Sequence, residues 1–154
     1  MYTDRRNQGG VTLVELLVVV AILGILGGVT GLFLMKYLPE YYLRAAANNL
    51  SQDIKFAQIS ALKSYRNYSV TFVAGTEQTY KVQDADAKDI KVVIIKNLNS
   101  EIRFEKIPTE SVEFNSEGAR IDNGDGLIKL KNSAGSIIET EVYRTGAVRV
   151  EKDN

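Results

Sequence analysis

The hydrophobic positions of this chain form three different patterns: a continuous run, a helical spacing and an alternation. Residues 16–35 carry no charged side chain, and a single carboxylate, Glu15, precedes them. At 1.5 Å per residue, about 20 such residues in a helix cross a hydrocarbon core of about 30 Å. Further along, the apolar positions recur at helical spacing and then alternate from Asn67 onward. The pattern predicts three structured parts: a transmembrane helix over 11–35, an amphipathic helix over 36–66, and a β domain over 67–154.

The amphipathic part has an apolar stripe with alternating spacings of four and three, which is typical of a helix packed on a sheet. The stripe consists of Leu43, Ala47, Leu50, Ile54, Ala57 and Ala61, and Ala46, Leu62 and Tyr65 widen it. The opposite face is expected to carry Arg44, Asn48, Asn49, Gln52, Asp53 and Lys55. Pro39 lacks a backbone donor, so a bend is predicted between Met35 and Pro39.

Short alternating runs separated by glycine-containing turns predict an antiparallel sheet, or two such sheets. The first two runs, 68–73 and 79–82, form a predicted hairpin, and an acidic loop over 84–89 leads to the apolar run 90–95. The remaining predicted strands cover 101–106, 111–114, 127–131, 137–143 and 147–150. The predicted fold class is therefore α+β, with a long N-terminal helix packed on an antiparallel β domain.

The composition excludes several functions. The chain has 19 basic and 19 acidic residues, so no overall field attracts nucleic acid. It has no cysteine and no histidine, which removes disulfides, thiolate zinc sites, histidine metal sites and the usual nucleophile and base pairs. No other nucleophile and base constellation is present. We therefore expect no enzyme activity and no cofactor.

The residues before the apolar run are polar, and Asp4, Arg5 and Arg6 give them a small positive excess. Positive flanks stay in the cytoplasm, so the following part of the chain is expected to be exported. A secretory signal peptide has a shorter apolar region of 7 to 15 residues and a small-residue cleavage site, and neither is present. The pattern favours a single-pass membrane anchor with its N-terminus in the cytoplasm.

The segment from Gly10 to Leu26, GVTLVELLVVVAILGIL, resembles the class III signal of type IV pilins and of the pseudopilins of type II secretion systems. The resemblance implies that a prepilin peptidase removes the leader 1–10 by cutting after Gly10, and that the new N-terminus at Val11 is methylated. The family usually has phenylalanine at this first mature position, where this chain has valine.

Glu15 lies four residues after Val11, so a new amine at Val11 and this carboxylate share one helix face, about 6 Å apart along the axis. A carboxylate within the membrane is costly unless it is paired or reaches the interface. The resemblance implies that Glu15 binds the N-terminal amine of a neighbouring subunit during assembly. The alternatives are the amine of its own chain and the lipid headgroups.

Three interpretations remain open for Gly24, Gly27, Gly28 and Gly31, and one of them is incidental composition without a role. The glycines form two small-xxx-small pairs that allow close helix packing. Each glycine also weakens a helix by about 1 kcal/mol relative to alanine, so the segment is equally suited to local melting inside a filament. Filaments of the family have a loosened helix in this region, which favours melting.

The C-terminal part resembles the H-type minor pseudopilins of type II secretion and the FimT-like minor pilins through 112–118, 126–130, 132–135 and 145–150. Major pseudopilins bind calcium, but Gly124 and Gly126 occupy ligand positions in the loop 122–126, which favours a tight turn without metal. Asp84, Asp86 and Asp89 are expected to form a solvated turn. Some FimT-like proteins bind DNA, yet Arg144, Arg149 and Lys152 are interleaved with acids, so nucleic-acid binding is not expected.

Together these features predict a minor pseudopilin of a type II secretion system. It would be inserted in the inner membrane, with its C-terminal domain in the periplasm, and then assembled into the periplasmic pseudopilus. The expected partners are other pseudopilins or pilins, the prepilin peptidase and methylase, and the inner-membrane assembly platform. The alternatives are a minor pilin of a type IV pilus or DNA-uptake system, and a membrane-anchored binding domain that never polymerises.

Overall fold

The computed structural model of the protein describes residues 11–76, 78–95 and 102–153, so Gly10 and the rest of the predicted leader lie outside the described residues. The chain divides into two compact units, with the boundary between Tyr37 and Leu38. The first unit holds the apolar N-terminal segment, and the second holds the rest of the chain.

One helix, α1, runs from Leu13 to Ser64 and belongs to both units. It begins directly after Thr12 and continues through Pro39. It ends where Tyr65 adopts a left-handed backbone conformation with φ of 53°, a common way to terminate a helix. The predicted amphipathic helix extended two residues further, to 66. The predicted bend at Pro39 remains a prediction.

Among the described residues, eight strands follow the helix and form two four-stranded antiparallel sheets, which confirms the predicted α+β class. The first sheet has the order β3-β2-β1-β5 and the second β4-β6-β7-β8. The strands are β1 (Tyr68–Val73), β2 (Thr79–Asp84), β3 (Asp89–Ile94), β4 (Arg103–Lys106), β5 (Val112–Phe114), β6 (Leu127–Lys131), β7 (Ile137–Val142) and β8 (Val148–Lys152).

The hairpin predicted from the first two alternating runs is present. Val70 pairs with Val82, and Phe72 pairs with Tyr80, so the large side chains of β1 and β2 share one face. A second hairpin joins β2 to β3, and its register shifts at Val82 and Gln83. The acidic loop is the turn of this hairpin.

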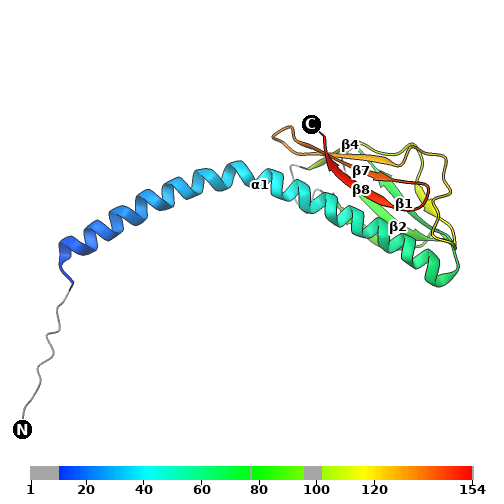
Figure 1. Ribbon diagram of the computed structural model, residues 1–154, viewed down its shortest axis with the longest axis horizontal. Helices are drawn as coiled ribbons and strands as arrows, with labels where there is room; N and C mark the ends of the chain where they lie inside the picture. Colours follow the sequence, from blue (N-terminus) through cyan, green and yellow to red (C-terminus); the bar gives the residue numbers. More distant parts are fainter. Residues whose placement is uncertain (1–10, 77, 96–101, 154) are drawn as a thin grey trace, which may run out of the picture. The chain divides into compact units, whose positions relative to one another are not determined.

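The core of the second unit lies between the C-terminal half of α1 and the inner faces of the two sheets (Figure 1). The helix contributes the predicted stripe, with Leu43, Ala47, Leu50, Ile54, Ala57 and Ala61 fully buried. The sheets contribute residues such as Val70, Val82, Phe114, Ile128 and Leu130. Burial of each large aliphatic or aromatic side chain stabilises the fold by about 1.5 to 3 kcal/mol. This core fixes the helix to the sheets.

Three residues differ in exposure from the prediction for the two helix faces. Leu62 and Tyr65, assigned to the apolar stripe, are 43% and 84% exposed. Asp53, assigned to the polar face, is buried. Tyr65 lies beyond the last helical residue, Ser64, and adopts a left-handed conformation. Near the C-terminal end of the helix the loop at Gly118 reaches Leu62, whereas Asp53 faces β2 and β3, where it finds hydrogen-bond partners.

The segment 122–126 is turned locally, because the N–H of Gly124 donates to the carboxylate of Asp122 at 3.0 Å. It is not a hairpin turn, since β5 belongs to the first sheet and β6 to the second. The segment between them crosses from one sheet to the other. Its glycines serve this crossing, since Gly126 has a φ of 66° and leaves space for the Arg120 side chain.

Candidate functional site

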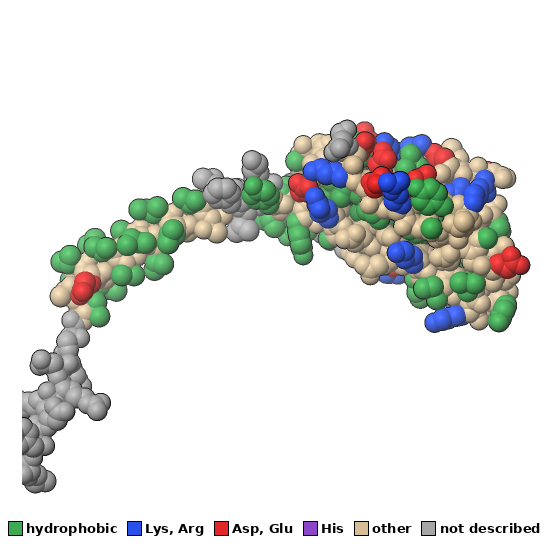
Figure 2. Space-filling view, in the orientation of Figure 1, with side chains coloured by type: hydrophobic (Ala, Val, Ile, Leu, Met, Phe, Trp, Pro, Cys, Tyr) green, Lys and Arg blue, Asp and Glu red, His purple; other side chains and the backbone are tan. Residues whose placement is uncertain are grey.

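The first candidate site is the apolar N-terminal part of α1. Leu13–Gly31 has a mean hydropathy of 2.5, and none of it is buried in the protein. By length and composition it can cross a membrane. On the face seen in the space-filling view, apolar side chains run along this segment, and one acidic group lies near its start (Figure 2). A surface this apolar needs lipid or protein around it.

The acidic group is Glu15, and it forms a capping box with Thr12. The backbone N–H of Thr12 donates to Oε2 of Glu15 at 2.9 Å, and so does the Thr12 hydroxyl, also at 2.9 Å. In return the backbone N–H of Glu15 lies 3.2 Å from the Thr12 hydroxyl oxygen. This reciprocal arrangement satisfies free donors at a helix start and explains why α1 begins here.

The capping box leaves Glu15 able to bind a cation. Both hydrogen bonds from Thr12 reach the same oxygen, and a carboxylate has about four acceptor positions on its two oxygens. Thr12 directly follows Val11, the residue that would carry the new amine after leader removal. Val11 precedes the first helical residue, Leu13, so the expected shared helix face is not present. The structure instead places the carboxylate in hydrogen-bond contact with Thr12, the residue next to the position of that amine.

Gly24, Gly27, Gly28 and Gly31 all lie within the helix, and a Cβ added at any of them would meet no other group of the described chain within 4 Å. The hydroxyl of Thr30 donates to the carbonyl of Leu26 at 2.7 Å, so the polar atom in this stretch is satisfied within the helix. The glycine face is therefore open to a partner. Local melting of the helix at these glycines in an assembly, as opposed to close packing, remains a prediction.

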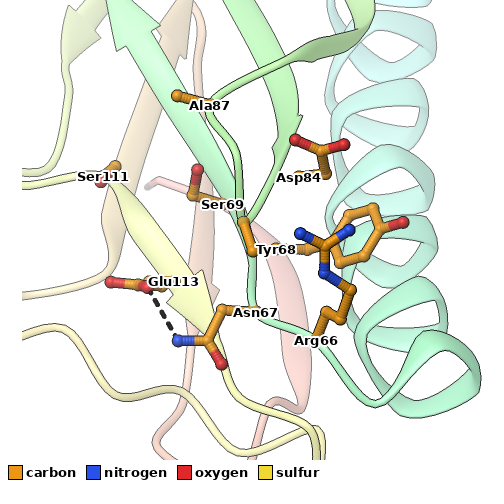
Figure 3. Close-up of a pocket in the computed structure, with 9 residues that line it drawn as sticks. Arg66, Asn67, Tyr68, Ser69, Asp84, Ala87, Ser111 and Glu113 are labelled. Carbon is orange, nitrogen blue, oxygen red and sulfur yellow. Dashed lines mark hydrogen bonds between the residues drawn. The ribbon is translucent and has the colours of Figure 1, made fainter.

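A second candidate is a polar surface pocket of about 420 Å³ in the β domain, at the start of β1 (Figure 3). Asn67 donates to Glu113 across the pocket at 3.2 Å, and Arg66 forms an ion pair with Asp86 at 2.7 Å. The pocket contains both positive and negative side chains. Arg66 and Glu113 already bind other protein groups, through the ion pair and the hydrogen bond just described. Its lining offers no concentrated charge for a ligand of one sign.

The acidic residues considered for calcium are engaged by protein donors. Asp84 Oδ1 accepts the backbone N–H groups of Asp86 and Lys88, both at 3.0 Å, and so closes the β2–β3 turn. Asp122 is buried beside Arg120. Among the described residues no group of three acidic side chains is arranged to hold a metal ion.

The basic residues near the C-terminus also have partners. Arg144 donates to the backbone carbonyl of Asp122, Arg149 is paired with Glu151, and Lys152 is paired with Glu40 at 2.9 Å. These contacts disperse the positive charge that a nucleic-acid site would concentrate.

A buried polar cluster between α1 and the first sheet was not predicted from the sequence. The Tyr80 hydroxyl donates to Oδ2 of Asp53 at 2.7 Å, and the Lys91 ammonium donates to Oδ1 at 2.5 Å. Burial and the hydrogen bond to Asp53 raise the pKa of Tyr80 above its usual range. The only sequence signal was an aspartate next to the buried positions Leu50 and Ile54, which also fits an exposed helix face.

Comparisons with known proteins found a sequence motif in the N-terminal part of the chain and solved structures with a similar fold. Residues 5–31 match the prokaryotic N-terminal methylation motif. The fold is similar to the minor pseudopilin EpsH from the type 2 secretion system of Vibrio cholerae, with a TM-score of 0.56 and 11% identity over 71% of this chain and 96% of that chain. It is also similar to the type IV minor pilin FimU of Pseudomonas aeruginosa, with a TM-score of 0.55 and 11% identity over 75% of this chain and 92% of that one. No curated protein sequence matches the chain.

Proposed function

We propose that this type IV pilin-like chain is a minor pseudopilin, a structural subunit of the periplasmic pseudopilus that drives protein export in type II secretion. The observation that carries the proposal is the combination of an N-terminal methylation motif with a fold similar to EpsH over nearly all of that chain. Its contribution would be mechanical, as one subunit of a filament pushed outward from the inner membrane.

Processing would convert an inner-membrane protein into a filament subunit. A prepilin peptidase would cut after Gly10 and methylate Val11. Before assembly, the segment Leu13–Gly31 would hold the chain in the inner membrane, with residues 1–10 in the cytoplasm and the β domain in the periplasm. In the filament, the same apolar surface would contact other helices instead of lipid.

Glu15 would guide this transfer by binding the Val11 amine of a neighbouring subunit. The capping box holds the carboxylate at the helix start, where spare acceptor positions remain for an ammonium group. In a low-dielectric surrounding, an unpaired carboxylate is costly, so pairing with the amine would favour the correct register between subunits. The open glycine face at Gly24, Gly27, Gly28 and Gly31 would then allow the helix to loosen.

Leader processing is the first test. Coexpression with a prepilin peptidase should remove residues 1–10 and add one methyl group at Val11, as read by intact-mass spectrometry. Gly10→Val should block the cut because its branched side chain occupies the cleavage position, and Gly9→Val is the matched control that should still be cut. Retention of the leader in the wild type would contradict the proposal.

Assembly is the second test. Glu15→Gln should leave membrane insertion intact and reduce incorporation into filaments by at least about tenfold, since a charge pair of about 1.4 kcal/mol or more is lost. Thr12→Val removes the capping hydroxyl but keeps the carboxylate, so it should reduce incorporation less. Equal incorporation of Glu15→Gln and the wild type, measured by crosslinking to other pseudopilins, would contradict the role of Glu15.

A minor pilin of a type IV pilus or DNA-uptake system is the second candidate, because the fold is about as similar to FimU as to EpsH. Deletion of the gene in its native host separates the two. Loss of exported proteins from the medium supports the pseudopilin, whereas loss of surface pili or of DNA uptake supports the pilin. A normal phenotype in all three assays would favour a binding domain that does not polymerise.

A further inference from the structure

An aromatic pair lies on α1 shortly after the apolar segment, in the first turns of the second unit. Tyr41 and Tyr42 are 67% and 37% exposed, and their rings meet edge to face with centroids 5.8 Å apart. Both rings therefore leave apolar surface that the described chain does not cover. A tyrosine also carries a hydroxyl, so it suits surroundings that are apolar at one end of the ring and wet at the other.

Charged side chains lie beside the aromatic pair. Glu40 accepts hydrogen bonds from Arg44 and Lys152, both at 2.9 Å, and the side chains of these two cations are 61% and 46% exposed. Lys152 belongs to β8, so the cluster connects the helix to the second sheet. Exposed charges are costly to move into hydrocarbon. The cluster therefore marks a point beyond which α1 stays in water.

Pro39 marks the same boundary from the backbone. It lies inside α1 and has no N–H, so it donates no hydrogen bond to the carbonyl of Met35, four residues earlier. A free carbonyl is costly in hydrocarbon, whereas water satisfies it at an interface. From Leu13 to Met35 the helix covers about 33 Å, slightly more than a hydrocarbon core of about 30 Å. The free carbonyl thus falls where the hydrocarbon ends.

The length of the helix agrees with this boundary. From Leu13 to Tyr41, α1 covers about 42 Å at about 1.5 Å per residue. A bilayer is about 40–45 Å thick when its headgroup layers are included. With Glu15 at the cytoplasmic interface, the aromatic pair reaches the opposite interface, where tyrosine is enriched in membrane proteins.

From this geometry we propose that Tyr41 and Tyr42 bind the phospholipid headgroup layer on the side of the membrane that carries the β domain. The rings lie among the lipid groups next to the hydrocarbon, and the hydroxyls and the Glu40 cluster face water. A subunit that leaves the membrane for a filament has to withdraw both rings from this layer. The proposal rests on the membrane insertion proposed above, and it holds for a secretion subunit and for a pilus subunit.

Tryptophan fluorescence of the full chain in vesicles tests the position of the rings. The chain contains no tryptophan, so a single introduced one reports only its own surroundings. The vesicles contain phosphatidylethanolamine and phosphatidylglycerol, with a spin-labelled quencher either on the headgroup or at the end of an acyl chain. Tyr41→Trp and Tyr42→Trp should each be quenched at least about twofold more by the headgroup label, because their rings lie at the interface.

Two matched variants calibrate the measurement. Leu23→Trp lies about 15 Å from Leu13 along the helix, near the middle of the bilayer, so the acyl-chain label should quench it more strongly. Tyr65→Trp lies about 36 Å beyond Tyr41 along the chain if the helical rise is continued, and neither label should quench it. Tyr65 is 84% exposed, so its replacement leaves the core intact.

The outcomes separate this proposal from membrane insertion. If the acyl-chain label quenches Leu23→Trp but neither label quenches the variants at Tyr41 and Tyr42, insertion stands and the proposal is overturned. A blue-shifted emission of these variants without lipid quenching would assign the rings to a contact between copies. Stronger quenching by the acyl-chain label would place them in the hydrocarbon and also overturn the proposal. If neither label quenches Leu23→Trp, the chain is not inserted, and the proposed membrane step fails as well.

Discussion

Arg120 and Asp122 form a buried ion pair in the crossing between the two sheets. The Nε of Arg120 lies 3.2 Å from Oδ2 of Asp122, and the two side chains are 4% and 3% exposed. Asp122 also accepts the backbone N–H groups of Glu113 and Gly124, at 3.1 and 3.0 Å. Arg120 donates to the carbonyls of Val142 and Gly124. The pair thus connects β5 of one sheet with the end of β7 in the other.

Asp122→Asn should destabilise the β domain by about 3 to 5 kcal/mol, because it leaves the Arg120 guanidinium buried without its counter-charge. The combined variant Arg120→Met with Asp122→Leu should lose less than the sum of the two single changes, since no charge remains buried. Urea unfolding measures both. A loss below about 1 kcal/mol for Asp122→Asn would mean that the pair is not essential to the crossing.

The fragment that begins at Leu38 should fold without the apolar N-terminal segment. Every buried apolar residue of the core cluster lies between Leu43 and Val142, within the second compact unit. Circular dichroism and a dispersed NMR spectrum would verify this, and the fragment then serves for the unfolding measurements. An unfolded fragment would show that the core needs the preceding helix turns.

Stability of the β domain should fall with rising pH above about 10. Burial and the hydrogen bond to Asp53 raise the pKa of Tyr80, so the folded state keeps this proton at a pH where the unfolded chain, with a pKa of about 10, has lost it. The stabilisation is complete below that pH and is lost above it. Tyr80→Phe should cost about 1 kcal/mol at neutral pH and flatten the decline.

Urea unfolding between pH 8 and 11 measures this difference. Tyr65→Phe is the matched control, because Tyr65 is exposed and should not alter the decline. An unchanged pH dependence in Tyr80→Phe would contradict the role of the buried hydroxyl.

Gly126→Ala should cost more than about 3 kcal/mol and disturb the same crossing, because it combines backbone strain with overpacking. Gly126 has a φ of 66°, and an added Cβ would overlap the Arg120 guanidinium and lie 2.5 Å from the Val142 carbonyl oxygen. Gly135→Ala is the matched control: its φ of 87° is equally unfavourable for alanine, but nothing lies within 4 Å. The control should lose only about 1 to 2 kcal/mol, the backbone cost alone. Equal losses would exclude the steric effect.

Local patterns sufficed to predict the elements. The apolar run after Glu15 defined a segment long enough for a membrane, and the stripe from Leu43 to Ala61 was confirmed as the buried helix face. The first hairpin was also predicted, because alternation and its turn are encoded within a few neighbouring residues. These features depend on short-range periodicity, which is written directly in the sequence.

Contacts between residues far apart in the sequence decided the features that were not predicted. Asp53 is buried because Tyr80 and Lys91, from two strands, supply hydrogen bonds that no helix pattern reveals. Asp122 and Gly126 lie in a crossing between the sheets and not in a hairpin, because the next strand joins the other sheet and Arg120 fills the space above the glycine. Sequence alone therefore determined the long apolar segment, its motif and the helix face, whereas only the tertiary structure decided which polar groups are buried and where the chain crosses between the sheets.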